Sequence, residues 1–179
     1  MCSCSGGDPV AFRVEGVAVE KDELVYYMRD YSSVAAAEME STYGVNSGED
    51  GFWEKRYGEL KPLEYLKEYT VEQIARTKME QIIAREQGIE TPLTWTEQHK
   101  ELEEENRRRR EAYEAGEVVY GSIERDFVAY FANTIYGMRM EVQEALGLTE
   151  EEYTAMVEER LERAEIGYED MSVSAEDVT

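Results

Sequence analysis

The sequence predicts a mostly α-helical fold, an elongated helical domain of about five helices with a short two-stranded β ribbon. Glu, Ala, Leu, Met and Arg are abundant and only three of the 179 residues are Pro, a composition that favours helix. Apolar residues recur at helical spacing in several long segments, whereas two short segments are β-branched. Hydrophobic residues make up 42% of the chain, enough for one core. We expect this domain over residues 11–166, between a flexible tether at 1–10 and an acidic, disordered tail at 167–179.

A short strand with a bend at Gly16 is expected at Ala11–Val19, where apolar residues are offset around the glycine. An isolated strand is not stable in water, and the evident pairing partner is Glu117–Gly121. We therefore expect Val14–Val19 to pair with Val118–Tyr120.

The first helix is expected at about Lys21–Tyr43, because apolar residues recur there at steps of three and four, and Gly44 ends it. The next segment, Gly44–Gly58, is rich in Gly and aromatic residues, which predicts a loop held by a buried Trp53. The apolar stripe of this first helix consists of Leu24, Met28, Tyr31, Ala35 and Met39.

A second helix should open with Pro62, whose missing amide costs nothing in a first turn, and run to about Gln87 before Gly88. A helix of this size is about 40 Å long, which favours an elongated domain. Its expected core face consists of Leu63, Leu66, Val71 or Thr70, Ile74, Met79, Ile82 and Ile83.

The third helix is expected at about Thr94–Ala115, and Thr94 and Glu97 have the spacing of a capping box. Its middle is almost wholly charged, with acidic residues four positions before basic ones. This order favours surface ion pairs, so the arginine run is not taken as a binding site. The expected pairs are Glu103 with Arg107, Glu104 with Arg108, and Glu105 with Arg109.

A fourth helix is expected at Ser122–Leu146, and Gly147 separates it from a fifth that begins at Thr149 with a second capping box to Glu152. The apolar residues of the fourth helix are Ile123, Phe127, Tyr130, Phe131, Thr134, Met138, Val142 and Leu146.

The net charge of -22, from 41 acidic and 19 basic residues, argues against nucleic acid as a partner, because phosphate backbones would be repelled. Anionic lipid head groups would be repelled for the same reason. The sequence contains no run of about 18 apolar residues, so no segment is expected to span a bilayer. The acidity instead favours solubility and weak attraction to cationic segments of other chains.

Both cysteines, Cys2 and Cys4, precede any periodic pattern, so neither is expected to contribute to a core. One interpretation is a lipoprotein in which Cys2, or alternatively Cys4, accepts the lipid, and the following Ser-Gly-Gly is a tether. A thiol pair of a reducing compartment, a weak Cys-x-Cys metal site, and a misplaced translation start remain open.

Three stretches resemble the SurA N-terminal-like domain of extracytoplasmic chaperones. FRVEGVAVEKDELVYYM resembles the family's opening strand and its turn into the first helix, with Glu15-Gly16 where Asn-Gly is usual. FWEKRYGELKPLEYLKEYTVEQIARTKMEQIIAREQGI resembles the loop and the long helix. ELEEENRRRREAYEAGEVVYG resembles the charged helix that leads to a second strand. The resemblance covers about Phe12–Leu146.

This resemblance implies a helical domain that cradles unfolded polypeptide, while a separate parvulin domain, when present, catalyses prolyl isomerisation. A parvulin domain takes on the order of 90 residues, and the segments of this chain are already assigned to helices and short strands. The resemblance is therefore to the peptidyl-prolyl isomerase family without its catalytic half.

The sequence offers no positive sign of catalysis. His99 is the only histidine, and it stands among polar residues of the third helix, where an exposed side chain is expected. The Cys and His needed for a zinc site are too few, and Glu-x-x-His pairs do not occur. We therefore expect no catalytic residue, no metal site and no cofactor.

Tyr and Met are unusually frequent, with 13 and eight residues, and both suit adaptable, partly wet binding surfaces. Several tyrosines fall beside or off the apolar stripes of their helices, where they could line a polypeptide-binding cleft. Ordinary helix packing is the alternative for each of them. The candidates are Tyr26, Tyr27, Tyr65, Tyr69, Tyr130 and Tyr136.

These observations lead to three hypotheses of function. The first is a non-catalytic, extracytoplasmic chaperone-type domain, lipid-anchored to the outer face of a bacterial cell membrane, that binds unfolded or secreted polypeptides. The second is a scaffold lipoprotein for one specific protein partner, and the third is the binding subunit of a peptidyl-prolyl isomerase. The oligomeric state stays open, a homodimer included.

Overall fold

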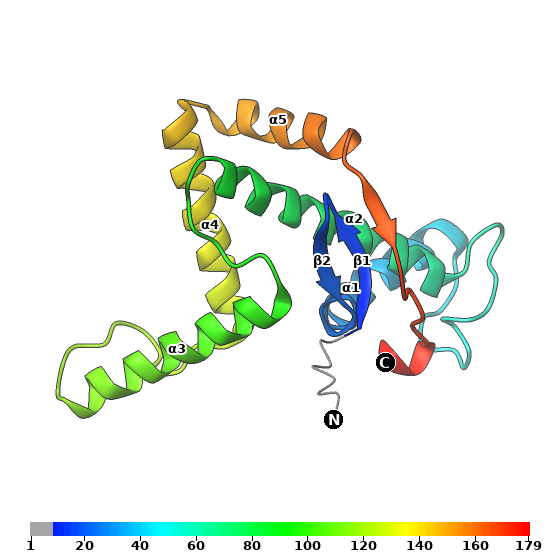
Figure 1. Cartoon of the computed structure of the whole chain (residues 1–179). Coiled ribbons are helices and arrows are strands. Elements are labelled where there is room, and N and C mark those ends of the chain that lie inside the picture. Colours follow the sequence, from blue (N-terminus) through cyan, green and yellow to red (C-terminus); the bar gives the residue numbers. More distant parts are fainter. Residues whose placement is uncertain (1–8) are drawn as a thin grey trace, which may run out of the picture. The chain divides into compact units, whose positions relative to one another are not determined.

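The structure, a computed structural model, describes residues 9–179 and is 61% helical, which confirms the mostly α-helical fold class (Figure 1). Contacts divide the chain into two compact units, so the domain expected over 11–166 is shared between them. Of the described residues, the first unit contains 9–77 together with Ala164–Thr179, and the second contains Lys78–Arg163. The helix α2, Pro62–Glu86, contributes residues to both.

The first unit contains a three-stranded antiparallel sheet in the order β2-β1-β3, instead of the expected two-stranded ribbon. Its strands are β1, Val10–Val14, β2, Val17–Glu20, and β3, Ile166–Tyr168. Glu15 and Gly16 both have positive φ, 49° and 79°, as a two-residue hairpin turn requires. This local turn pairs β1 with β2 at little loop-closure cost.

The expected pairing of Val14–Val19 with Val118–Tyr120 is therefore wrong. Glu117–Gly121 forms no strand and belongs to the loop between the third and fourth helices. The partner on the other edge of β1 is β3, which pairs Val14 with Ile166.

The helix α1, Lys21–Tyr43, follows β2 directly and contacts β1 and β2. Gly44 ends α1 in the left-handed conformation and donates its backbone N–H to the Glu40 carbonyl, as predicted. The buried apolar residues of α1 are Leu24, Met28, Ala35 and Met39. Tyr31, which the sequence placed on the same stripe, is half-buried.

The loop after α1 is held by aromatic residues, but the buried ring belongs to Phe52 and not to Trp53. The Phe52 ring lies 5.1 Å from the Trp53 ring and 5.9 Å from the Tyr57 ring. Trp53 is half-buried, and its carbonyl accepts a hydrogen bond from the Leu63 amide at the start of α2.

The expectation of a disordered tail at 167–179 is also corrected. Residues 166–168 form β3, and Ala175–Asp177 form a 3-10 turn. Val178 is buried, and Lys21 holds the segment through Asp170 at 2.9 Å. Acidic residues of this segment, whose composition suggested disorder, form ion pairs with basic side chains of the same unit.

The second unit contains the end of α2 and the helices α3, Trp95–Glu114, α4, Phe127–Leu146, and α5, Glu150–Glu162. Both predicted capping boxes are present, at Thr94 with Glu97 and at Thr149 with Glu152. The fourth helix begins at Phe127 and not at Ser122, because the Asp126 side chain accepts from the Ala129 amide and caps it there.

The expected core face of α2 is largely confirmed, since Leu66, Thr70, Val71, Ile74, Met79 and Ile83 are buried. Polar side chains are buried on the same helix. Lys78 and Gln81 donate to the carbonyls of Leu93 and Pro92, at 2.6 and 2.7 Å, and so fasten the loop that leads into α3. These bonds satisfy backbone groups that the loop would otherwise leave buried and unpaired.

Candidate functional site

Tyrosine side chains of α1 and α2 meet in a continuous row in the first unit. Edge contacts join Tyr26 to Tyr27 and Tyr31 to Tyr69, each with ring centroids 5.4 Å apart. Stacked contacts join Tyr27 to Tyr31 at 6.0 Å and Tyr65 to Tyr69 at 6.4 Å. We call these five side chains the tyrosine ladder.

Helical spacing explains the ladder. Tyr27 and Tyr31 are four residues apart on α1, and Tyr65 and Tyr69 are four apart on α2, so each helix presents a pair on one face. The edge contact between Tyr31 and Tyr69 joins the two pairs. All five residues are half-buried, and the hydroxyl of Tyr27 is itself buried.

Four of the six predicted candidates, Tyr26, Tyr27, Tyr65 and Tyr69, are thus brought together. Sequence reasoning missed Tyr31, which was assigned to the apolar stripe of its helix. The signal was present in its spacing of four residues from Tyr27, which is the spacing that also marks the pair on α2.

Carboxylates surround the ladder, and they act on the tyrosine pKa values. Burial raises the pKa of Tyr27, and the nearby Glu23 raises it further. Burial and then Asp30 raise the pKa of Tyr31. Tyr65 has its pKa raised by burial and then by Glu38, with Glu72 adding to the effect. The phenols of Tyr27, Tyr31 and Tyr65 are therefore neutral at physiological pH, with carboxylates nearby.

The other two candidates belong to the second unit. Tyr130 is half-buried, and its hydroxyl lies 3.4 Å from a carboxylate oxygen of Glu101. Burial raises the pKa of Tyr130, and Glu101 adds to this rise. Tyr136 is 65% exposed on α4. Neither residue is part of the tyrosine ladder.

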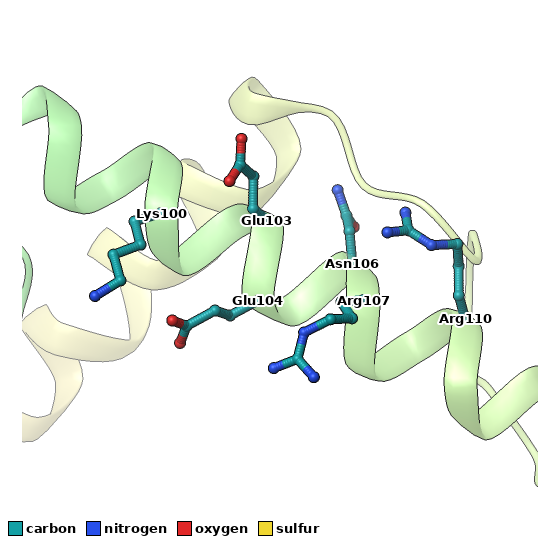
Figure 2. Close-up of a pocket in the computed structure, with 6 residues that line it drawn as sticks. All are labelled: Lys100, Glu103, Glu104, Asn106, Arg107 and Arg110. Carbon is teal, nitrogen blue, oxygen red and sulfur yellow. The ribbon is translucent and has the colours of Figure 1, made fainter.

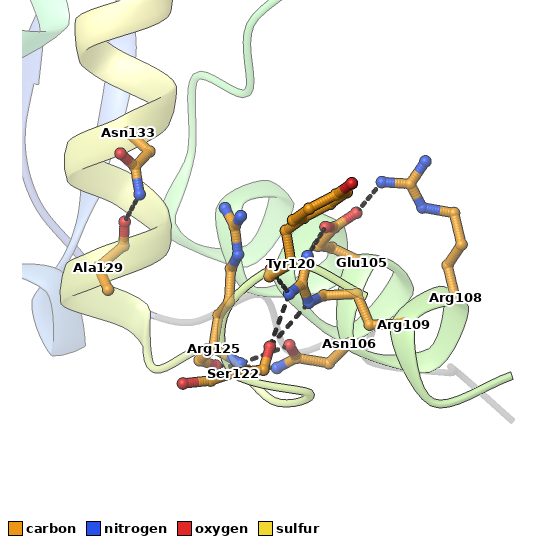
Figure 3. Close-up of polar contacts among 9 residues, drawn as sticks. All are labelled: Glu105, Asn106, Arg108, Arg109, Tyr120, Ser122, Arg125, Ala129 and Asn133. Carbon is orange, nitrogen blue, oxygen red and sulfur yellow. Dashed lines mark hydrogen bonds and ion pairs between the residues drawn. The ribbon is translucent and has the colours of Figure 1, made fainter. Parts of the chain in front are cut away.

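The arginine run of α3 holds the loop that follows it (Figure 3). The Arg109 side chain donates to the carbonyl of Ser122 at 2.7 Å and to that of Tyr120. Asn106 exchanges two hydrogen bonds with the backbone of Arg125, at 2.8 and 2.9 Å. The loop is therefore fixed at several points, with Tyr120 exposed.

The ion pairs of this run differ in part from the expected set. Glu105 pairs with Arg109 at 3.5 Å as expected, and also with Arg108. Arg107 instead pairs with Glu111 at 3.3 Å, and Arg110 with Glu124 at 2.7 Å. Glutamates that follow the run in the chain thus compete with those that precede it. These contacts join the arginine run to its own helix and to the loop that follows it.

An open hollow of about 580 Å³ lies along one flank of α3. Figure 2 shows the side chains that line it. Its lining comes from a single helix and carries both charges, such as Lys100 and Arg110 beside Glu103 and Glu104. A second hollow, of about 330 Å³, lies between α3 and the following loop, beside Arg109 and Val118. Small-molecule sites are concave and mostly apolar with a few convergent polar groups, and neither hollow has this character.

The expectation of an exposed His99 is wrong. Its ring is half-buried and stacks on Phe127 with centroids 4.6 Å apart and planes 9° apart. The Trp95 ring lies 4.0 Å away, and the Trp95 carbonyl is 3.0 Å from His99 Nδ1. Trp95 lies one helical turn before His99 on α3, and Phe127 lies on α4. The sequence around His99 did not predict the contact with Phe127. The ring is an element of packing.

Within residues 9–179, no group of three or more His, Cys, Asp and Glu side chains is placed to hold a metal ion. No helix of this described part is long and apolar enough to cross a membrane. Cys2 and Cys4, the predicted lipidation sites, lie outside the described residues.

Comparison with models of known protein families, with curated proteins and with solved structures found no match to this chain.

Proposed function

We propose that this chain is a non-catalytic, chaperone-type domain of the SurA N-terminal-like kind, which binds unfolded or extended segments of other polypeptides. The tyrosine ladder is the observation that carries this proposal. It offers five half-buried aromatic side chains in a row, each held by its neighbours. Tyr provides a large contact area at low cost in conformational entropy, and its hydroxyl suits a surface that stays partly wet.

The carboxylates beside the ladder favour basic and apolar client segments. A Lys or Arg side chain over a tyrosine ring gains cation–π attraction, and the same side chain gains Coulomb attraction from nearby carboxylates. Glu38 and Glu72 beside Tyr65, and Asp30 beside Tyr31, supply this attraction at the ladder itself. The net charge of -22 extends it over longer distances.

The proposal assigns recognition to this chain and no chemical step. Contacts to rings and diffuse electrostatics discriminate poorly between sequences, which is the property that a chaperone of many clients needs. We further propose an extracytoplasmic location with a lipid on Cys2 or Cys4. The mass of the protein purified from membranes of its own host tests this, because an acyl group adds a defined increment that is lost in either the Cys2→Ser or the Cys4→Ser variant.

Suppression of aggregation by the full chain tests the binding proposal. The chain should slow the aggregation of several unrelated unfolded proteins at near-stoichiometric ratios. Replacement of Tyr65 and Tyr69 by Ser should weaken client affinity by about 1 to 2 kcal/mol with little change in helix content. A matched control replaces Tyr113 and Tyr120, two exposed tyrosines of the second unit, and should leave client affinity unchanged.

A second arm tests the charge component. Basic clients should lose more affinity than neutral ones when salt is raised, because screening removes the attraction and leaves apolar contact. Replacement of Glu38 and Glu72 by Gln should reduce this difference between clients. Protection of one partner only, without effect on unrelated unfolded chains, would contradict the proposal and favour a scaffold for that partner.

A further inference from the structure

In the hairpin of β1 and β2, the edge of β1 that faces away from β2 pairs with the chain's own residues 164–179. We call these residues the C-terminal segment. Three residue pairs join β1 to β3 in antiparallel register, centred on Arg13 and Gly167. The pairing continues beyond both strand ends. Glu15 donates its amide to the Glu165 carbonyl at 2.9 Å, and Glu169 donates its own to the Ala11 carbonyl at 2.9 Å. Backbone bonds of this kind accept any extended chain, whatever its side chains.

Basic side chains of the first unit add selectivity for the charge of the segment. Arg13 pairs with Glu169 at 2.7 Å, and Lys21 pairs with Asp170 at 2.9 Å. Lys67 donates to the Met171 carbonyl at 2.8 Å. The C-terminal segment carries five acidic residues and no basic one. The edge of β1 thus presents backbone donors and acceptors, with cationic side chains beside them.

The C-terminal segment is held mainly by backbone hydrogen bonds and by polar contacts that are partly open to solvent. Val178 is its one buried residue, and Tyr168 is 63% exposed. The pairs of Arg13 and Lys21 are partly open to solvent, and exposed ion pairs contribute little to stability. Segments with few buried contacts open locally far more often than the whole fold unfolds. We therefore expect the segment to leave the edge more readily than the first unit unfolds.

We propose that the edge of β1 is a binding site for an extended, acidic segment of another polypeptide, which the C-terminal segment occupies until it is displaced. The incoming segment would add as a strand, place two adjacent carboxylates at Arg13 and Lys21, and seat an apolar side chain where Val178 lies. This site is independent of the tyrosine ladder and selects the opposite charge. The apparent affinity of the site for another segment equals its intrinsic affinity multiplied by the fraction of time that the edge is uncovered.

The test uses the full chain and a fluorescent peptide with the sequence of residues 164–179. Replacement of Glu169 and Asp170 by Lys places like charges against Arg13 and Lys21, so it weakens the chain's own segment by repulsion and leaves the edge of β1 untouched. Fluorescence anisotropy should show weak binding of the peptide to the natural chain and binding at least about tenfold tighter to this variant. Val178→Ser is a second variant that weakens the segment without changing its charge, and it should also bind the peptide more tightly.

A peptide with Lys at the positions of Glu169 and Asp170 is the matched control and should not bind either variant. Helix content by circular dichroism verifies that both variants are folded. The proposal is overturned if the folded variants bind no peptide, or if they bind the lysine peptide as tightly as the acidic one. If the lysine variant does not fold, Val178→Ser alone provides the test. The proposal is then overturned if folded Val178→Ser binds no peptide, or binds the lysine peptide as tightly as the acidic one.

Discussion

Two arginine–carboxylate pairs of the second unit share one geometry and differ in burial, so their loss should have different effects on stability. Arg139 donates two hydrogen bonds to Glu80, at 2.8 and 3.0 Å, and Arg160 donates two to Glu86, at 2.7 and 2.9 Å. Both arginine side chains are 41% exposed. The Glu80 side chain is 6% exposed, whereas that of Glu86 is 46% exposed.

Arg139→Ala should destabilise the second unit by about 2 to 3 kcal/mol, because it leaves the Glu80 carboxylate buried without a counter-charge. Breaking a fully buried pair costs about 3 to 5 kcal/mol, and water entering from the exposed Arg139 side reduces that loss. Arg160→Ala should cost less than about 1 kcal/mol, because Glu86 regains water when its partner is removed. The double variant Glu80→Gln with Arg139→Ala should recover part of the loss, since it removes the buried charge.

The two tryptophans allow the second unit to be followed separately within the full chain. Trp53 belongs to the first unit and Trp95 to the second, where Trp95 lies 4.7 Å from the Phe127 ring. In a Trp53→Phe background, urea unfolding monitored by fluorescence therefore reports Trp95 and the unit around it. Equal losses for Arg139→Ala and Arg160→Ala, or no recovery in the double variant, would refute this reasoning about burial.

Two further predictions concern local interactions. The Ser172 hydroxyl and then Lys21 hold the pKa of Asp170 below its usual range, so its carboxylate contributes stability that is complete above about pH 4 and lost as pH falls further. Trp53 fluorescence in a Trp95→Phe background should show the first unit weakening below that pH, and less so in Asp170→Asn. Thr94→Ala removes the cap of α3 and should cost about 1 kcal/mol in urea unfolding reported by Trp95.

The helices were predictable because their signals are local. Pro62, Gly44, and the capping residues Thr94 and Thr149 mark boundaries within a few residues of the helix they limit, and the structure places those boundaries as expected. The start of α4 was misplaced because apolar Ile123 extends the helical pattern beyond Asp126, which caps the helix. A side-chain cap within an apolar pattern outweighs the pattern itself.

The sheet and the C-terminal segment were not predictable in the same way. Arg13 and Lys21 contact residues 156 and 149 positions away, and no local pattern reveals such pairs. An acidic, aperiodic segment is typical of disorder when it is considered alone. Its order depends on basic residues of the first unit, which only the fold brings to it.

The candidate site was predictable in part. Tyrosines beside the apolar stripes were expected to form a surface, and four of the six do meet in the tyrosine ladder. The contact of Tyr31 with Tyr69 depends on how α1 and α2 pack, so the membership of Tyr31 could not be derived from either helix alone.

The most direct measurement of the central claim follows the tyrosine rings themselves while a client peptide binds. The full chain, with its 13 tyrosines isotope-labelled on the ring, is titrated with an extended peptide of Lys and apolar residues and observed by NMR. We predict that the signals of the tyrosine ladder shift together along one binding curve, while those of the exposed Tyr113 and Tyr120 stay unchanged. Binding of the peptide with no change at the tyrosine ladder, or with equal changes at all tyrosines, would contradict the claim.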